Sequence, residues 1–156
     1  ICIEIQNIIG IPENAAFKDV LDTPAVNHII YNDLMDQKKH LEELLIELKE
    51  KNISEKDIVI LSPKIRSKSV VGLLNGYNIA DYSVKSTGRI RFSTIQAFKG
   101  LESSTIILTD IESYQDEKLI YVGLSRARFN LYILETESAS SERVNLFFKR
   151  RLANDR

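Results

Sequence analysis

The chain has 156 residues, the usual size of one domain. Apolar residues make up 44% and charged residues 28%, as in ordinary globular proteins, so the composition excludes a disordered or low-complexity chain. The 21 Lys and Arg residues nearly balance the 22 Asp and Glu residues, so the net charge of −1 indicates neither a nucleic-acid nor a membrane partner, and a local patch would have to bind either one.

The cysteine and histidine content and the first residues of the sequence limit the kinds of protein that this chain could be. The single cysteine, Cys2, excludes an internal disulfide and a cysteine metal cluster and fits a reducing cytosol, so we expect a cytoplasmic protein. Two histidines are too few for a histidine metal site, so no metal ligands are expected. No apolar run approaches the roughly 20 residues of a membrane span, and no signal peptide opens the chain. Because the first residue is Ile1 rather than Met, we expect one domain over residues 1–156, taken from a longer protein.

Short β-rich runs alternate with amphipathic helical runs, which predicts an α/β fold with a mostly parallel sheet. Residues 1–5 alternate in polarity and predict a first strand, and residues 28–31 predict a second. Leucines at helical spacing predict a helix over about 34–51 that ends at Asn52. Residues 58–61 form a continuous apolar run, typical of a strand that is buried on both faces.

The second half continues the alternation. The predicted elements are a short helix over 66–74, strands over 90–95 and 105–111, a helix over 116–128, a strand over 131–135 and a helix over 141–152. Ligands of parallel α/β sheets bind beyond the carboxyl ends of the strands. Functional residues are therefore expected just after Leu61, Ile95, Ile111 and Glu135.

The richest of these stretches is Thr-Ile-Gln-Ala-Phe-Lys-Gly-Leu-Glu over residues 94–102. Gly100 would let the backbone approach a phosphate closely, and Glu102 could accept hydrogen bonds from ribose hydroxyls. Taken alone, the stretch has a simpler interpretation as a strand-to-helix turn in which Lys99 and Glu102 are solvated.

A second candidate is Tyr-Val-Gly-Leu-Ser-Arg-Ala-Arg over residues 121–128. Arg126 follows Val122 by four residues and Leu119 by seven, which places it on the apolar side of the predicted helix. Arginine offers phosphate an always-charged planar fork. The alternative is that Arg126 and Arg128 only complement the dipole at the helix end.

Together the two stretches resemble a known family. Thr-x-Gln-x-x-Lys-Gly-Leu-Glu over 94–102 resembles motif V of superfamily 1 helicases of the UvrD/Rep type, and Leu-Ile-Tyr-Val-Gly-Leu-Ser-Arg-Ala-Arg over 119–128 resembles their motif VI. Residues 57–63 are similar to the strand and loop that the family has upstream of motif V. The resemblance covers about residues 40–135. It implies the second RecA-like domain of an ATP-dependent DNA helicase, a three-layer α/β fold with a mostly parallel sheet.

The resemblance also implies roles for individual residues. Arg126 would be the arginine finger that reaches the γ-phosphate of ATP. The residues that would line the nucleotide are Lys99, Gly100 and Glu102. Those that would face single-stranded DNA, with RNA not excluded, are Lys64, Thr94 and Gln96.

The chain departs from the family in several places. It has neither the Gly-x-x-x-x-Gly-Lys-[Ser/Thr] phosphate loop nor an Asp-Glu magnesium motif, both of which belong to the first RecA-like domain. ATP and Mg²⁺ are therefore expected only in the full-length parent, with that domain as partner, and this chain alone should not hydrolyse ATP. The arginine-bearing motif IV is not visible. Gln96 replaces the usual His, which puts a DNA contact at this position in question, and Ser125 replaces the usual Thr.

Two other interpretations stay open. A domain of this kind could be a non-catalytic module that binds nucleic acid or a partner protein, although such a module needs neither Arg126 nor Glu102. A receiver or nucleotide-binding domain unrelated to helicases would lack the paired motifs.

The two histidines, His28 and His40, are expected in structural positions. Loop tyrosines that could stack on bases but are expected to pack are Tyr77, Tyr82 and Tyr114.

Overall fold

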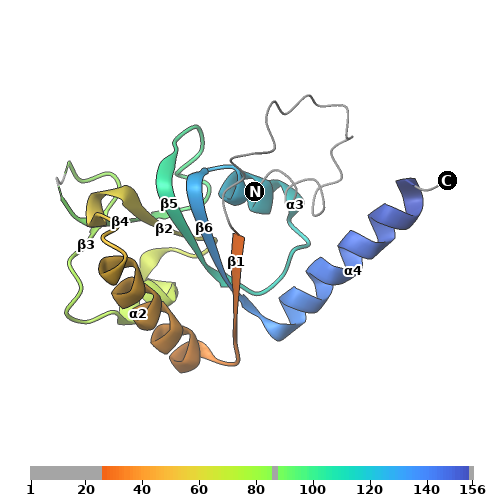
Figure 1. Ribbon diagram of the computed structural model, residues 1–156, viewed down its shortest axis with the longest axis horizontal. Helices are drawn as coiled ribbons and strands as arrows, with labels where there is room; N and C mark the ends of the chain where they lie inside the picture. Colours follow the sequence, from red (N-terminus) through yellow and green to blue (C-terminus); the bar gives the residue numbers. More distant parts are fainter. Residues whose placement is uncertain (1–25, 86–87, 155–156) are drawn as a thin grey trace.

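The computed structural model describes residues 26–85 and 88–154 (Figure 1). The strand predicted over residues 1–5 lies outside this part of the chain, as does Cys2. The strands are β1 (Val26–Tyr31), β2 (Ile58–Ser62), β3 (Ile79–Asp81), β4 (Ile90–Thr94), β5 (Ser103–Ile111) and β6 (Ala127–Thr136). The helices are α2 (Leu34–Glu50), α3 (Glu117–Leu124) and α4 (Glu137–Asn154), with short 3₁₀ turns η2 (Glu55–Asp57), η3 (Arg66–Lys68) and η4 (Val70–Leu73).

The six strands form one sheet in the order β1-β6-β5-β2-β4-β3, and every neighbouring pair is parallel. All strands therefore begin at one edge, which we call the amino edge, and end at the opposite carboxyl edge. Strands β2 and β5 lie at the centre, where β2 is buried at every position. The parallel sheet confirms the α/β, RecA-like fold class predicted from the sequence.

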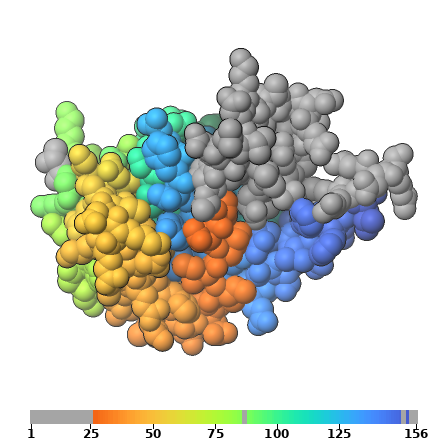
Figure 2. Space-filling view, in the orientation of Figure 1, coloured from red at the N-terminus to blue at the C-terminus, as the bar shows by residue number. Residues whose placement is uncertain are grey.

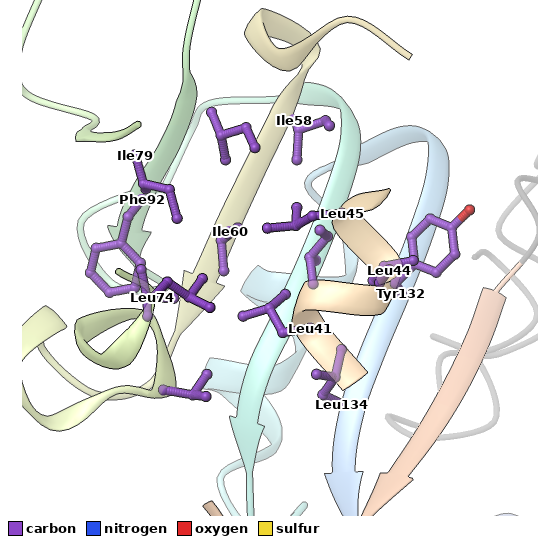
Figure 3. Close-up of a cluster of buried hydrophobic side chains, with 14 of the residues drawn as sticks. Leu41, Leu44, Leu45, Ile58, Ile60, Leu74, Ile79, Phe92, Tyr132 and Leu134 are labelled. Atoms are coloured by element: carbon purple, nitrogen blue, oxygen red, sulfur yellow. The ribbon is translucent and has the colours of Figure 1, made fainter. Parts of the chain in front are cut away.

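Alternate residues of the central strands enter two separate cores. Val59 and Leu61 of β2 face one core together with α3, while Ile58 and Ile60 face the other together with α2. Figure 3 shows leucines of α2, including Leu41, over the β2 side chains of the second core. The alternation of side chains in a strand thus produces a three-layer arrangement with the sheet in the middle. In the space-filling view, β1 and α2 lie side by side and α4 extends away to one side (Figure 2).

Helix α2 forms as its pattern predicts. The Asp33 side chain caps it by accepting hydrogen bonds from the backbone N–H groups of Met35 and Asp36, each at 2.9 Å. Leucines at i, i+3, i+4 and i+7 form the buried stripe. The chain leaves the helix at Asn52, whose φ of 60° is the left-handed conformation that commonly ends helices.

Four predicted elements differ in detail from the structure, and a fifth element, β3, was not predicted. The helix predicted over 66–74 is the two 3₁₀ turns η3 and η4, and the three-residue strand β3 was missed because so short a run has no readable pattern. The helix predicted over 116–128 ends at Leu124, because the chain turns there to let Ala127 pair with Ser103. Strand β6 and helix α4 each begin four residues earlier than predicted. No helix among the described residues is long and apolar enough to cross a membrane.

Candidate functional site

The segment of residues 95–102 connects the two edges of the sheet, and we call it the crossing loop. It leaves β4 at the carboxyl edge and enters β5 at the amino edge, and β2 lies between these two strands. Ile95 and Phe98 are fully buried in the core that also contains Leu124 of α3. The loop is thereby anchored over one face of the sheet, and its two ends lie at opposite edges.

At the amino edge, the end of the crossing loop meets the turn before β6. The backbone N–H of Ser103 donates to the Arg126 carbonyl at 3.0 Å, and the Arg126 Nη1 donates to the Leu101 carbonyl at 3.3 Å. The structure therefore brings together the motif V-like and motif VI-like segments. It does so at the edge opposite to the one where functional residues were expected.

Arg126 lies beyond the helix in which it was predicted. Helix α3 starts after Asp116, whose side chain accepts from the Leu119 N–H, and its C-cap is Ser125. Arg126 follows in the turn, half-buried, and its Nε donates back to the Val122 carbonyl at 3.0 Å. The prediction that Arg126 lies on the apolar side of a helix was thus wrong, because the helix ends at Leu124, two residues before Arg126.

The other predicted nucleotide-facing residues belong to the last four residues of the crossing loop, the part that Arg126 contacts through Leu101. Lys99, Gly100 and Glu102 are all exposed. Gly100 has a φ of +83°, a conformation that glycine adopts freely, and a Cβ there would meet nothing within 4 Å. Within residues 26–85 and 88–154, the side chains of Lys99 and Glu102 make no hydrogen bond or ion pair. An exposed cation and an exposed carboxylate thus lie two residues before and one residue after Leu101, whose carbonyl the guanidinium contacts.

The predicted strand-facing residues gather at the carboxyl edge instead. Thr94 is the last residue of β4, and its Oγ1 accepts a hydrogen bond from the Ala97 N–H at 3.3 Å. Gln96 is exposed two residues later. Lys64 follows β2, and its Nζ forms an ion pair of 2.5 Å with Glu112, which follows β5. Sequence reasoning pointed to the position after Ile111 but missed that Glu112 neutralises Lys64.

A groove of about 460 Å³ opens beside Thr94. Its lining residues come from the ends of β2, β3 and β4 and include Ile65, Arg66 and Tyr82. Arg66 donates to the Asp81 carboxylate at 3.0 Å and to the Ile79 carbonyl at 2.9 Å, which holds the loop after β2 against the end of β3. The Tyr82 ring packs edge-on against Phe98 at 4.8 Å, so this tyrosine packs, as expected.

The buried carboxylate of Asp110 holds the loops at the carboxyl edge in place through hydrogen bonds. Asp110 is 2% exposed and accepts hydrogen bonds from the hydroxyls of Ser62 at 2.7 Å and Ser69 at 2.6 Å. It also accepts from the Val70 N–H at 3.2 Å, so it fixes η4 to the ends of β2 and β5. The Tyr31 hydroxyl is buried without a hydrogen-bond partner among the described residues, and burial together with the nearby Asp110 raises its pKa above the ordinary range. This cluster positions the loops of the carboxyl edge.

A second buried carboxylate, Glu135, lies one residue before the end of β6. It accepts hydrogen bonds from His28 of β1 at 3.0 Å, from Arg143 of α4 at 2.8 Å and from the Tyr114 hydroxyl. Burial alone would raise its pKa, but the hydrogen bonds from His28, Arg143 and Tyr114 outweigh that effect and lower the pKa to about 2. His28 therefore has the structural position that was expected for it, as does His40, which lies near Asp36 and Glu43 on the surface of α2.

The exposed residues at the amino edge have side chains that can bind polar and anionic groups. A guanidinium with spare donors, a free carboxylate and a glycine that leaves its surroundings open are the groups that phosphate and ribose require. Among the described residues, no group of three His, Cys, Asp or Glu side chains is placed to hold a metal ion. The guanidinium and the carboxylate at the amino edge can form hydrogen bonds to phosphate and ribose oxygens.

Comparison with known proteins supports the fold. No family model matches the chain, and no curated protein does. A solved structure, the C-terminal domain of a possible DNA helicase from Lactobacillus plantarum WCFS1, is similar with a TM-score of 0.61 and 14% sequence identity. The match covers 80% of this chain and 81% of that one. At this identity the likeness shows the fold class, a three-layer α/β domain with a parallel sheet, and nothing of the activity.

Proposed function

We propose that this chain is the second RecA-like domain of an ATP-dependent, superfamily 1 DNA helicase. In that role it supplies an arginine finger and a ribose-binding carboxylate to an ATP site completed by the first RecA-like domain. It also supplies polar contacts to a single strand. The domain works in the cytoplasm. In support of a helicase role, the similar solved structure is described as the C-terminal domain of a possible DNA helicase.

One observation carries the proposal. The two segments that resemble helicase motifs V and VI are separated by 17 positions in sequence, from Glu102 to Leu119, yet Arg126 of one contacts Leu101 of the other. Their contact occurs at the amino edge, where Glu102 is also exposed. A fold that only provided a docking surface would need neither this contact between the two segments nor an exposed carboxylate one residue after it in the sequence.

The two edges support a division of labour. Nucleotide-facing residues lie at the amino edge and strand-facing residues at the carboxyl edge, and the crossing loop belongs to both. An arginine finger contributes about 10³ to 10⁵ in turnover, or roughly 4 to 7 kcal/mol of transition-state stabilisation. That energy is ample to bias a domain-closure equilibrium of a few kcal/mol. The loop offers a direct path by which closure on ATP would alter the strand contacts.

The proposal is tested by reconstitution. The 156-residue chain alone should show no ATP turnover and bind ATP only weakly, at about millimolar affinity for such partial contacts. The protein that also carries the phosphate-loop domain, with Mg²⁺, should hydrolyse ATP faster when single-stranded DNA is added. Steady turnover by the chain alone would contradict the proposal. A protein whose turnover ignores both DNA and RNA would favour the docking-module alternative, and a preference for RNA would change the substrate.

A further inference from the structure

The hydroxyl of Ser125 contacts the guanidinium of Arg126 at two places. Its Oγ accepts a hydrogen bond from Arg126 Nη2 at 2.8 Å and another from Nε at 3.1 Å. The same hydroxyl donates to the Val122 carbonyl at 3.3 Å. All hydrogen-bonding capacity of the hydroxyl is thereby used, since a serine oxygen has one proton and two lone pairs.

These contacts fold the arginine back on its own turn. Nε also donates to the Val122 carbonyl at 3.0 Å, and Nη1 donates to the Leu101 carbonyl at 3.3 Å. A guanidinium has five N–H groups, and these bonds use three of them. One N–H on each terminal nitrogen has no partner among the described residues. The side chain is therefore held in place while part of its fork stays available.

The Ser125 hydroxyl does more than cap helix α3. Backbone hydrogen bonds already close the end of this helix, since the Ser125 N–H donates to the Tyr121 carbonyl at 3.0 Å and the Arg126 N–H to the Gly123 carbonyl at 3.3 Å. The contact from the Ser125 hydroxyl to Val122 adds to these. The two contacts to the guanidinium add nothing to the helix end, so their effect is on the position of the arginine.

We infer that Ser125 is a positioning residue for Arg126: its hydroxyl holds the guanidinium folded against Leu101 when no nucleotide is bound. A nucleotide phosphate would then compete for the guanidinium with Ser125 and with the end of the crossing loop. The role of this arrangement in ATP hydrolysis rests on the proposed function. The resting position of the arginine does not, and it can be measured alone.

The test uses the 156-residue chain without nucleotide. Phenylglyoxal modifies accessible guanidinium groups, and tandem mass spectrometry of a peptide that contains both arginines gives separate rates for Arg126 and Arg128. Ser125→Ala should raise the rate at Arg126 about tenfold, because two charge-assisted hydrogen bonds are lost. Ser125→Thr keeps the hydroxyl and should restore the slow rate. Arg128 is exposed, and its guanidinium lies over the Phe129 ring and makes no hydrogen bond to the Ser125 hydroxyl, so its rate should stay constant.

A near-isosteric variant covers the case in which Ser125→Ala does not fold. Ser125→Cys keeps the size of the side chain but offers only a weak acceptor, and it too should expose Arg126 to fast modification. Unchanged Arg126 rates in the folded alanine or cysteine variant would overturn the inference, and so would a threonine variant as fast as alanine. Because no nucleotide is present, an absence of ATPase activity in the parent would contradict the proposed function and leave this measurement unaffected.

Discussion

The Nη1 atom of Arg126 donates a hydrogen bond to the carbonyl oxygen of Leu101 at 3.3 Å, across a gap of 25 residues in sequence. The two residues precede neighbouring parallel strands, β6 and β5, so both lie at the amino edge of the sheet. Leu101 also lies near the end of the crossing loop that starts beside Thr94 at the other edge. The arginine thus contacts the segment through which the two candidate sites are connected.

Replacing Arg126 by alanine tests the arginine finger. In the protein that carries both ATPase domains, Arg126→Ala should lower ATP turnover by about 10³ or more. Affinity for nucleotide should fall far less, because such a group acts on charge that develops in the transition state. Arg126→Lys should recover little, since a point charge does not reproduce the planar fork. Steady-state kinetics give kcat and KM for each variant.

Arg128 is the matched control for this experiment. It lies in β6, exposed, with its guanidinium 5.7 Å from the centre of the Phe129 ring, and not at a helix end as predicted. Arg128→Ala removes the same charge two residues away and should leave turnover nearly unchanged. A larger loss in Arg128→Ala than in Arg126→Ala would show that the finger is assigned to the wrong residue.

The carboxyl edge is tested by a double replacement. Thr94→Ala with Gln96→Ala should weaken single-strand binding about tenfold, the effect of losing two polar contacts. The loss should be similar for all base sequences, because contacts to the nucleic-acid backbone carry no sequence information. Fluorescence anisotropy with labelled single strands of different sequence measures both quantities. Equal affinities for the variant and the parent would remove these residues from the strand path.

The ion pair of Lys64 with Glu112 gives a second measurement at this edge. Glu112 lies 2.5 Å from the Lys64 ammonium and competes with any phosphate for it. Glu112→Gln should therefore strengthen single-strand binding and steepen its salt dependence, by about 0.7 in the slope of log affinity against log salt for one added phosphate contact. Lys64→Ala should abolish the gain. No response to Glu112→Gln would indicate that Lys64 does not face the strand.

The sequence predicted the sheet centre well because its strands are fully buried. An apolar run such as residues 58–61, bounded by polar and turn-forming residues, favours a strand covered on both faces, and the structure confirms it. The helix over 34–51 was predicted equally well, from its leucine spacing and its stop at Asn52. Burial of whole runs leaves a pattern that can be read from sequence alone.

The site was predicted less completely because its geometry depends on where elements end. The apolar spacing around Arg126 suggested a helix to Arg128, but pairing of Ala127 with Ser103 overrides that local preference. Opposite edges for Thr94 and Glu102 follow from the crossing loop, which passes between two strands of the same direction. Register and strand order are set by tertiary contacts, and no window of sequence contains them.

The buried carboxylate of Asp110 should be important for stability. Asp110→Ala would leave the Ser62 and Ser69 hydroxyls and the Val70 N–H without their acceptor, at a cost of about 3 kcal/mol in the free energy of unfolding. Asp110 has a φ of 59°, which asparagine tolerates well, so Asp110→Asn should be the milder change. Urea denaturation measures both. Equal stability of the alanine variant and the parent would show that the cluster contributes nothing.

Two glycines give a matched pair for the packing of the loops. A Cβ at Gly72 would lie 2.6 Å from the Arg66 carbonyl oxygen, a backbone atom that is unable to turn away. Gly72→Ala should therefore cost about 1 to 3 kcal/mol, as overpacking does. At Gly123 a Cβ meets the Leu108 side chain at 3.0 Å, and the gain of about 1 kcal/mol in helix propensity offsets the contact. Thermal unfolding should show a lower midpoint for the first variant only.

Acid should weaken the fold through Glu135. Its pKa falls from 4.5 to about 2 in the folded chain, so the folded state favours the ionised carboxylate. The stabilisation is complete above the unfolded value near 4.5 and is lost as the pH falls toward about 2, amounting to about 3 kcal/mol. Glu135→Gln should reduce stability at pH 7, because Arg143 loses a charged acceptor, and should flatten the decline between pH 4.5 and 2. Urea titrations across this range decide the point, since an unchanged pH profile in Glu135→Gln would assign the acid sensitivity to other groups.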